Sequence, residues 1–122
     1  MSGVVNPTIV EIVKNYLNVV RQHGVNARFA VLYGSQARGD ARDWSDIDVV
    51  VLCPEFDGGY TRDTIKVLWR MRAVTDSRIE PVPCGLKEWE SGDGRPIIEI
   101  ARREGVEITL DDEPSVGKAV GK

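Results

Sequence analysis

Two short stretches contain residues whose types and spacing suit phosphate and metal chemistry. Gly34 and Ser35 directly follow an apolar run, and two carboxylates, Asp46 and Asp48, open a second apolar run. Acids at i and i+2 of a strand point to the same face, with Cα atoms roughly 6.5–7 Å apart. Such oxygens suit Mg²⁺, which binds one or two carboxylates together with substrate phosphates. The spacing therefore predicts a phosphate-binding turn that faces a divalent metal site.

The turn itself matches no common nucleotide motif in full. Gly39 follows Gly34 by five residues, as in the P-loop G-x-x-x-x-G-K-[ST], but Asp40 stands where the lysine is required. The dinucleotide pattern G-x-G-x-x-G is also absent. A strand followed by a glycine turn still presents N–H groups to an anion, and here Ser35 adds a hydroxyl and Arg38 a positive charge. The alternative is an ordinary strand-to-helix turn with Ser35 as its N-cap.

Among the acids, Asp48 is the hardest to explain as a surface charge. It lies inside the apolar run 47–52, where an unpaired carboxylate is costly, so either a cationic partner or a metal must compensate it. The alternative for Asp46 is a cap or turn residue at the start of the strand. The acids together do not have the spacing of a calcium-binding EF-hand. Glu80, in a third strand-like segment, is the candidate for a further metal-binding acid. The alternative for Glu80 is a solvated edge-strand residue paired with Arg78.

Apolar periodicity predicts the elements that must position these residues. Asn6-Pro7 and the box Thr8-x-x-Glu11 mark the start of the first helix. The pattern predicts helices at 8–24, 61–76 and 96–103, strands at 27–33, 47–53, 78–84 and 106–110, and a polar connection, with room for a short helix, at 35–43. This alternation indicates an α/β or α+β fold with a four-stranded sheet.

Two details of the predicted elements concern the third strand and the helix before it. Pro81 and Pro83 indicate that the strand at 78–84 lies at an edge of the sheet, because proline cannot donate to a central ladder. The basic residues of the helix at 61–76 are interpreted as a solvated face; they are Arg62, Lys66, Arg70 and Arg72.

Length and composition limit the class of protein. The 122 residues predict one domain, residues 1–110, followed by a flexible tail at 111–122. The net charge of −3 gives no argument for a nucleic-acid or membrane partner. Neither a membrane span nor a signal peptide is visible, so a cytoplasmic location is expected. Cys53 and Cys84 form no CxxC motif and are interpreted as small buried hydrophobic residues.

Taken together, Gly34-Ser35, ten intervening residues and Asp46-x-Asp48 form the pattern GSx10DxD, here GSQARG…SDIDVVV. This pattern between two apolar strands resembles the minimal nucleotidyltransferase (MNT) family of the DNA polymerase β-like superfamily, over roughly residues 8–110. The resemblance implies a mixed sheet flanked by helices. It also implies transfer of a nucleoside monophosphate from Mg-NTP, AMP from ATP in the favoured case, to a hydroxyl acceptor.

The resemblance also implies roles for the residues that match it. Gly34 and Ser35 correspond to positions that hold the NTP phosphates, and Arg38 to a phosphate contact or a support of the turn. Asp46 and Asp48 correspond to ligands of two Mg²⁺ ions. Glu80 falls where a third carboxylate, acting as a metal ligand and general base, is expected.

Three interpretations of the acceptor remain open at this point. In the first, the chain is the MNT antitoxin of a HEPN-domain toxin and adds AMP to a tyrosine of that partner. In the second, it modifies a small molecule or another protein, with the acceptor site supplied by a homo-oligomer or a separate subunit. In the third, it binds nucleotide and masks a partner without catalysis, although a decayed site has no reason to keep a buried acid.

Overall fold

The computed structural model describes residues 5–42, 44–58, 62–92 and 94–110. The predicted tail, 111–122, lies outside these ranges. Within them the chain forms, in order, α1 (Pro7–Gln22), β1 (Phe29–Tyr33), α2 (Ser35–Arg38), β2 (Ile47–Leu52), the 3-10 helix η1 (Pro54–Gly58), α3 (Arg62–Val74), β3 (Ile79–Cys84), α4 (Leu86–Ser91), α5 (Pro96–Glu104) and β4 (Val106–Thr109). No helix of the described residues has the length and hydrophobicity needed to cross a bilayer.

The four strands form one mixed sheet in the order β3-β2-β1-β4. β2 runs parallel to β3, whereas β1 is antiparallel to both β2 and β4. This confirms the predicted α+β class with a four-stranded sheet. The edge position predicted for Pro81 and Pro83 is also confirmed, because β3 is the first strand of the sheet that the described residues form.

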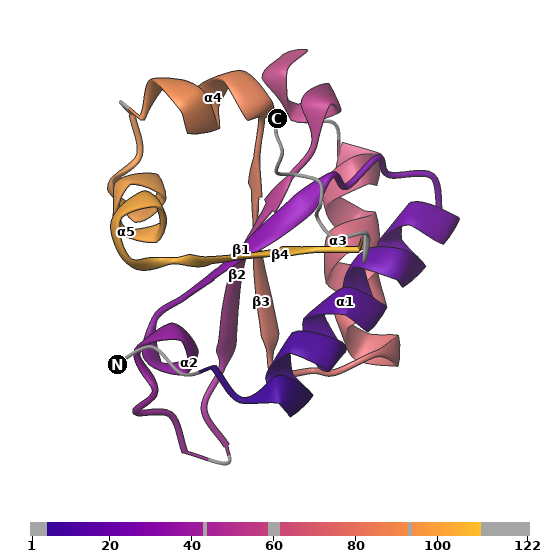
Figure 1. The fold of residues 1–122 in the computed structure, drawn as a ribbon. Coiled ribbons are helices and arrows are strands. Elements are labelled where there is room, and N and C mark those ends of the chain that lie inside the picture. The colour runs from indigo at the N-terminus through magenta and orange to yellow at the C-terminus, as the bar shows by residue number, and fades with distance from the viewer. Residues whose placement is uncertain (1–4, 43, 59–61, 93, 111–122) are drawn as a thin grey trace.

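Helices cover both faces of the sheet (Figure 1). α1 and α3 lie against one face, and α4 and α5 lie against the other. Along β2 the side chains alternate between the two cores, so Val49 and Val51 face α1 and α3 while Val50 and Leu52 face α5. Because both faces are covered, β2 reads as a nearly continuous apolar run. The same alternation puts Asp48 on the α5 side.

The structure differs from the predicted elements at three places. α1 begins at Pro7, one residue before the predicted start at Thr8. The start signal Asn6-Pro7 is confirmed, because Oδ1 of Asn6 accepts from the Thr8 N–H at 2.8 Å. Residues 54–58 form η1, in a stretch for which the sequence pattern predicted no helix or strand. α4 was not predicted at all. Its N-terminus is capped from a distance, because the Asp57 carboxylate accepts from the Lys87 N–H at 3.0 and 3.2 Å.

A buried tyrosine joins the two helices on one face of the sheet. The Tyr16 hydroxyl of α1 donates to the Leu68 carbonyl of α3 at 2.6 Å, and both residues are fully buried. We expect Tyr16→Phe to lower the free energy of unfolding by about 1–2 kcal/mol, because the bond is lost and the carbonyl loses a partner away from water. Urea denaturation would measure this, and an unchanged midpoint would contradict it.

Candidate functional site

Three residues on neighbouring strands form a row at one end of the sheet. Asp48 of β2 pairs with Tyr33 of β1 and with Glu80 of β3. Adjacent strands lie about 4.8 Å apart, so paired side chains are neighbours on one face. The register therefore brings Glu80 beside Asp48. Glu80 was proposed from the sequence without any means of knowing its register.

Asp46 joins these two acids from the residue before β2. Asp46 is exposed and Asp48 half-buried. Burial raises the pKa of Asp48 above its usual value, and the charges of Asp46 and then Glu80 raise it further. No described residue donates a hydrogen bond to the Asp48 carboxylate. Three carboxylates thus repel one another around a poorly solvated group, which is the electrostatic situation that a bound cation relieves.

The glycine turn packs directly on this acid. Gly34 has φ 76° and ψ −153°, a backbone conformation confined almost wholly to glycine. A Cβ at Gly34 would lie 2.7 Å from Oδ2 of Asp48, which is inside van der Waals contact. α2 begins at Ser35 with Gly34 as its N-cap residue, so the interpretation of Ser35 as the cap is wrong. The Gly34 turn and Asp48, 14 positions apart in the sequence, are therefore in contact.

Arg38 lies at the end of α2, close to the acids. Its Nε contacts Asp40 Oδ2 at 3.3 Å, and its Nη1 contacts Glu104 Oε1 at 3.4 Å. The guanidinium side chain is about half exposed, so these pairs add little stability. Its charge lowers the pKa of Asp48, against the larger effects that raise it. Arg38 is therefore placed where it could meet an anion beside Asp48.

Glu80 has a partner that was not expected from the sequence. Arg72 Nη2 lies 3.1 Å from Glu80 Oε2. Arg78, the partner expected in the alternative interpretation, pairs instead with Asp76 at 2.9 Å. The interpretation of Arg72 as part of a solvated face is wrong, since its side chain is only 25% exposed. No local pattern links two residues eight apart across a helix-to-strand turn, so the pair was missed.

Tyr33 was also missed, because the strand was interpreted as simply apolar. Its side chain is buried in the cluster that includes Val31 and Val50. Burial, followed by the charges of Asp48 and Glu80, raises the pKa of Tyr33 to about 12. The phenol therefore stays neutral at physiological pH and adds no further negative charge to the acidic row.

The oxygen-rich donor set fits a hard divalent cation, although it is not gathered around one point. Within the described ranges, no group of three or more acidic, histidine or cysteine side chains converges closely enough to hold a metal ion by itself. Mg²⁺ does not need such a cage, because it takes one or two carboxylates and completes its shell with phosphates and water. Asp48 is half-buried beside Asp46 and Glu80, with only the smaller effect of the Arg38 charge acting against their repulsion among the described residues, and this is the observation that supports the fit.

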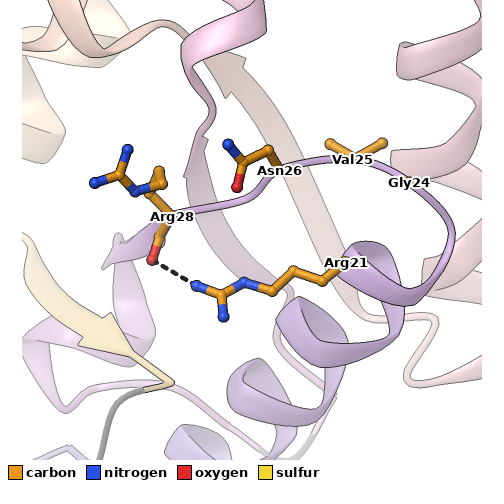
Figure 2. A pocket seen from close by; sticks show the side chains of 5 residues that line it. All are labelled: Arg21, Gly24, Val25, Asn26 and Arg28. Atoms are coloured by element: carbon orange, nitrogen blue, oxygen red, sulfur yellow. Dashed lines mark hydrogen bonds between the residues drawn. The ribbon is translucent and has the colours of Figure 1, made fainter.

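Three hollows on the described surface lie away from these acids. One, of about 420 Å³, lies between the end of α1 and the start of β1 (Figure 2). Two others, of about 460 and 340 Å³, are lined by residues that include Trp89. None of the three is lined by Asp46, Asp48 or Glu80. The 420 Å³ hollow is at the opposite end of β1 from the acidic row.

Comparisons with known proteins show the family and the fold of this chain. A family model described as a nucleotidyltransferase domain matches residues 13–105, a range that contains Gly34, Asp48 and Glu80. The crystal structure of a candidate nucleotidyltransferase from Sulfolobus solfataricus is similar, with a TM-score of 0.60 and 18% sequence identity. The similarity covers 83% of this chain and 79% of that one, and at this identity it shows a shared fold. No curated protein matches the sequence.

Proposed function

This chain belongs to the nucleotidyltransferase domain family, and we propose that it transfers AMP from ATP to a hydroxyl acceptor with the help of Mg²⁺. The single observation that carries the proposal is the contact between the Gly34 turn and Asp48, which is itself paired in register with Glu80. A turn suited to phosphate thus adjoins a row of acids suited to a cation. Phosphoryl transfer needs these two sites side by side.

On the donor side, Gly34, Ser35 and Arg38 would hold the triphosphate. Gly34 would let the backbone approach the phosphates closely, because it has no side chain to fill the space beside Asp48. The half-buried Ser35 hydroxyl would donate to a phosphate oxygen. Arg38 would exchange its exposed pairs with Asp40 and Glu104 for a phosphate, at small cost because both pairs are solvated.

On the metal side, Asp46, Asp48 and Glu80 would hold Mg²⁺, two ions in the form we favour. Bound there, the metal would neutralise the charge on the phosphate oxygens during displacement. Glu80 would also accept the proton of the acceptor hydroxyl. A bond then forms between the acceptor oxygen and the α-phosphorus, the bond from the α-phosphorus to the bridging oxygen breaks, and pyrophosphate leaves with its electron pair.

For the acceptor, we propose a tyrosine of a HEPN-domain partner, as the resemblance to MNT antitoxins implies. Accessibility supports an acceptor carried on another macromolecule. Asp46 is exposed, and the Glu80 side chain keeps 36% of its accessible surface. A side chain presented by a partner protein can therefore reach the acids without any rearrangement of the core. A small-molecule acceptor and binding without transfer are the other outcomes of the test.

We expect the chain to move radiolabel from [α-³²P]ATP to the partner protein in the presence of Mg²⁺. Mass spectrometry should then locate AMP on a partner tyrosine, and EDTA should stop the reaction. Label on a small molecule instead would redirect the acceptor assignment, and a partner that binds stably without gaining label would contradict catalysis. A partner in which the modified tyrosine is replaced by phenylalanine provides the control.

A further inference from the structure

Arg72 has no role in the reaction proposed above, yet it makes several contacts with the segment that carries Glu80. Its Nη2 contacts Glu80 Oε2 at 3.1 Å, and its Nε donates to the Ile79 carbonyl at 2.5 Å. Nη2 also donates to the Ser77 carbonyl. The guanidinium lies over the ring of Trp69, 5.0 Å from its centroid. We infer that Arg72 is a positioning residue that fixes Glu80 for metal binding and proton transfer, an inference that rests on the proposed function.

These contacts make Arg72 a fixed support for Glu80. The backbone carbonyls of Ser77 and Ile79 lie three residues and one residue before Glu80, so the guanidinium is anchored to the same segment that carries the carboxylate. Stacking on Trp69 adds a further restraint on its plane. A planar fork held in this way loses little freedom when it binds one more oxygen. Arg38, with its side chain twice as exposed, has no comparable anchoring.

Glu80 needs such a support more than its neighbours do. A glutamate side chain has one more rotatable bond than the side chains of Asp46 and Asp48. Strand pairing fixes the backbone of Glu80 but not its side chain, so its carboxylate samples more positions. Arg72 binds Oε2, while Oε1 accepts no hydrogen bond from any described residue. One oxygen is thereby restrained and the other is left for chemistry. Preorganisation of this kind contributes to rate through positioning.

A second arginine provides a matched control at the other end of the sheet. Arg21, near the end of α1, donates from Nε to the Ala27 carbonyl at 2.7 Å. Its Nη2 donates to the Arg28 carbonyl at 3.2 Å, the bond drawn in Figure 2. It thus binds the segment that enters β1 as Arg72 binds the segment that enters β3. Within the part of the chain that the structure describes, its hydrogen bonds go to backbone carbonyls and to no acid. Replacement of Arg21 therefore measures the stability that is lost when such arginine-to-carbonyl hydrogen bonds are removed, without any effect on an acid.

The test compares Arg72→Met with Arg21→Met, each in the wild-type and the Glu80→Gln background. Both single variants should lower the melting temperature, but only Arg72→Met should reduce kcat, by about 10–100-fold, with the KM for ATP nearly unchanged. Calorimetry with a non-hydrolysable ATP analogue should show weaker Mg²⁺ binding by Arg72→Met alone. In the Glu80→Gln background, Arg72→Met should cost no further activity, because both changes act on one carboxylate.

Two results would overturn the inference while leaving the proposed function intact. The first is that Arg72→Met and Arg21→Met have equal kcat values, although Glu80→Gln by itself inactivates the protein. The other is a full additional loss of kcat when Arg72→Met is combined with Glu80→Gln. Full transfer activity in Glu80→Gln would instead remove the role proposed for Glu80, and with it the function assigned to Arg72.

Discussion

Asp48→Asn is expected to reduce transfer by at least about 1,000-fold, equivalent to about 4 kcal/mol of transition-state stabilisation. Asp48 is the acid on which the site converges, since it contacts the Gly34 turn and pairs in register with Glu80. An amide at this position keeps the shape but loses the charge that a divalent cation needs. Initial rates of label transfer at saturating ATP and Mg²⁺ would measure the loss, and we expect Asp46→Asn to behave similarly.

The same substitution should leave the metal-free protein at least as stable as the wild type. Burial and the charges of Asp46 and Glu80 raise the pKa of Asp48 in the folded state. The folded protein therefore holds this proton more tightly than the unfolded chain does. The contribution of Asp48 to the free energy of unfolding consequently falls as the pH rises through its folded-state pKa. At neutral pH the charged group opposes folding, and asparagine removes that cost.

Thermal unfolding in EDTA tests this second expectation. The melting temperature of Asp48→Asn should equal or exceed that of the wild type at pH 7.5. This advantage should shrink as the pH falls through the raised folded-state pKa of Asp48, and it should be gone by about pH 4, where the unfolded carboxyl also takes up its proton. Glu107→Gln is the control, an exposed strand carboxylate on β4 away from the row. A wild-type rate in Asp48→Asn would refute the metal site, and a strongly lowered melting temperature would refute the electrostatic account.

Gly34→Ala should damage both folding and transfer. The backbone conformation of Gly34 costs a non-glycine residue on the order of 1–3 kcal/mol. The new Cβ would also lie 2.7 Å from Asp48 Oδ2, so the carboxylate must move. A displacement of about 1 Å at a reacting centre can reduce the rate about 100-fold. Denaturant unfolding and the initial rate of transfer would measure the two effects separately.

Gly24→Ala separates strain from displacement of the acid. Gly24 also has a positive φ, +92°, but a Cβ there would meet nothing within 4 Å. Gly24→Ala should therefore lose stability and keep most of its activity at a temperature where it is folded. Equal losses of transfer in the two folded variants would show that the contact between Gly34 and Asp48 does not matter for the reaction.

The sequence predicted the order and type of most elements because their signals are local. Apolar periodicity indicated α1, α3 and α5 and all four strands, and the prolines of β3 indicated its edge position. The helix α4 was not predicted, because the carboxylate that caps it belongs to Asp57, which is 30 residues away from Lys87 in the sequence. A cap supplied by another part of the fold leaves no mark in the helix's own sequence.

The sequence by itself determined which residues could do this chemistry: a glycine-serine turn and two acids at a spacing that suits phosphate and metal. Only the tertiary structure decided how they meet. A shift of one residue between β2 and β3 would turn Glu80 to the opposite face, and packing of the two cores sets that register. The contact of Gly34 with Asp48 and of Arg72 with Glu80 likewise joins segments that the chain brings together only on folding. Their roles in transfer stay predictions, which the variants above test.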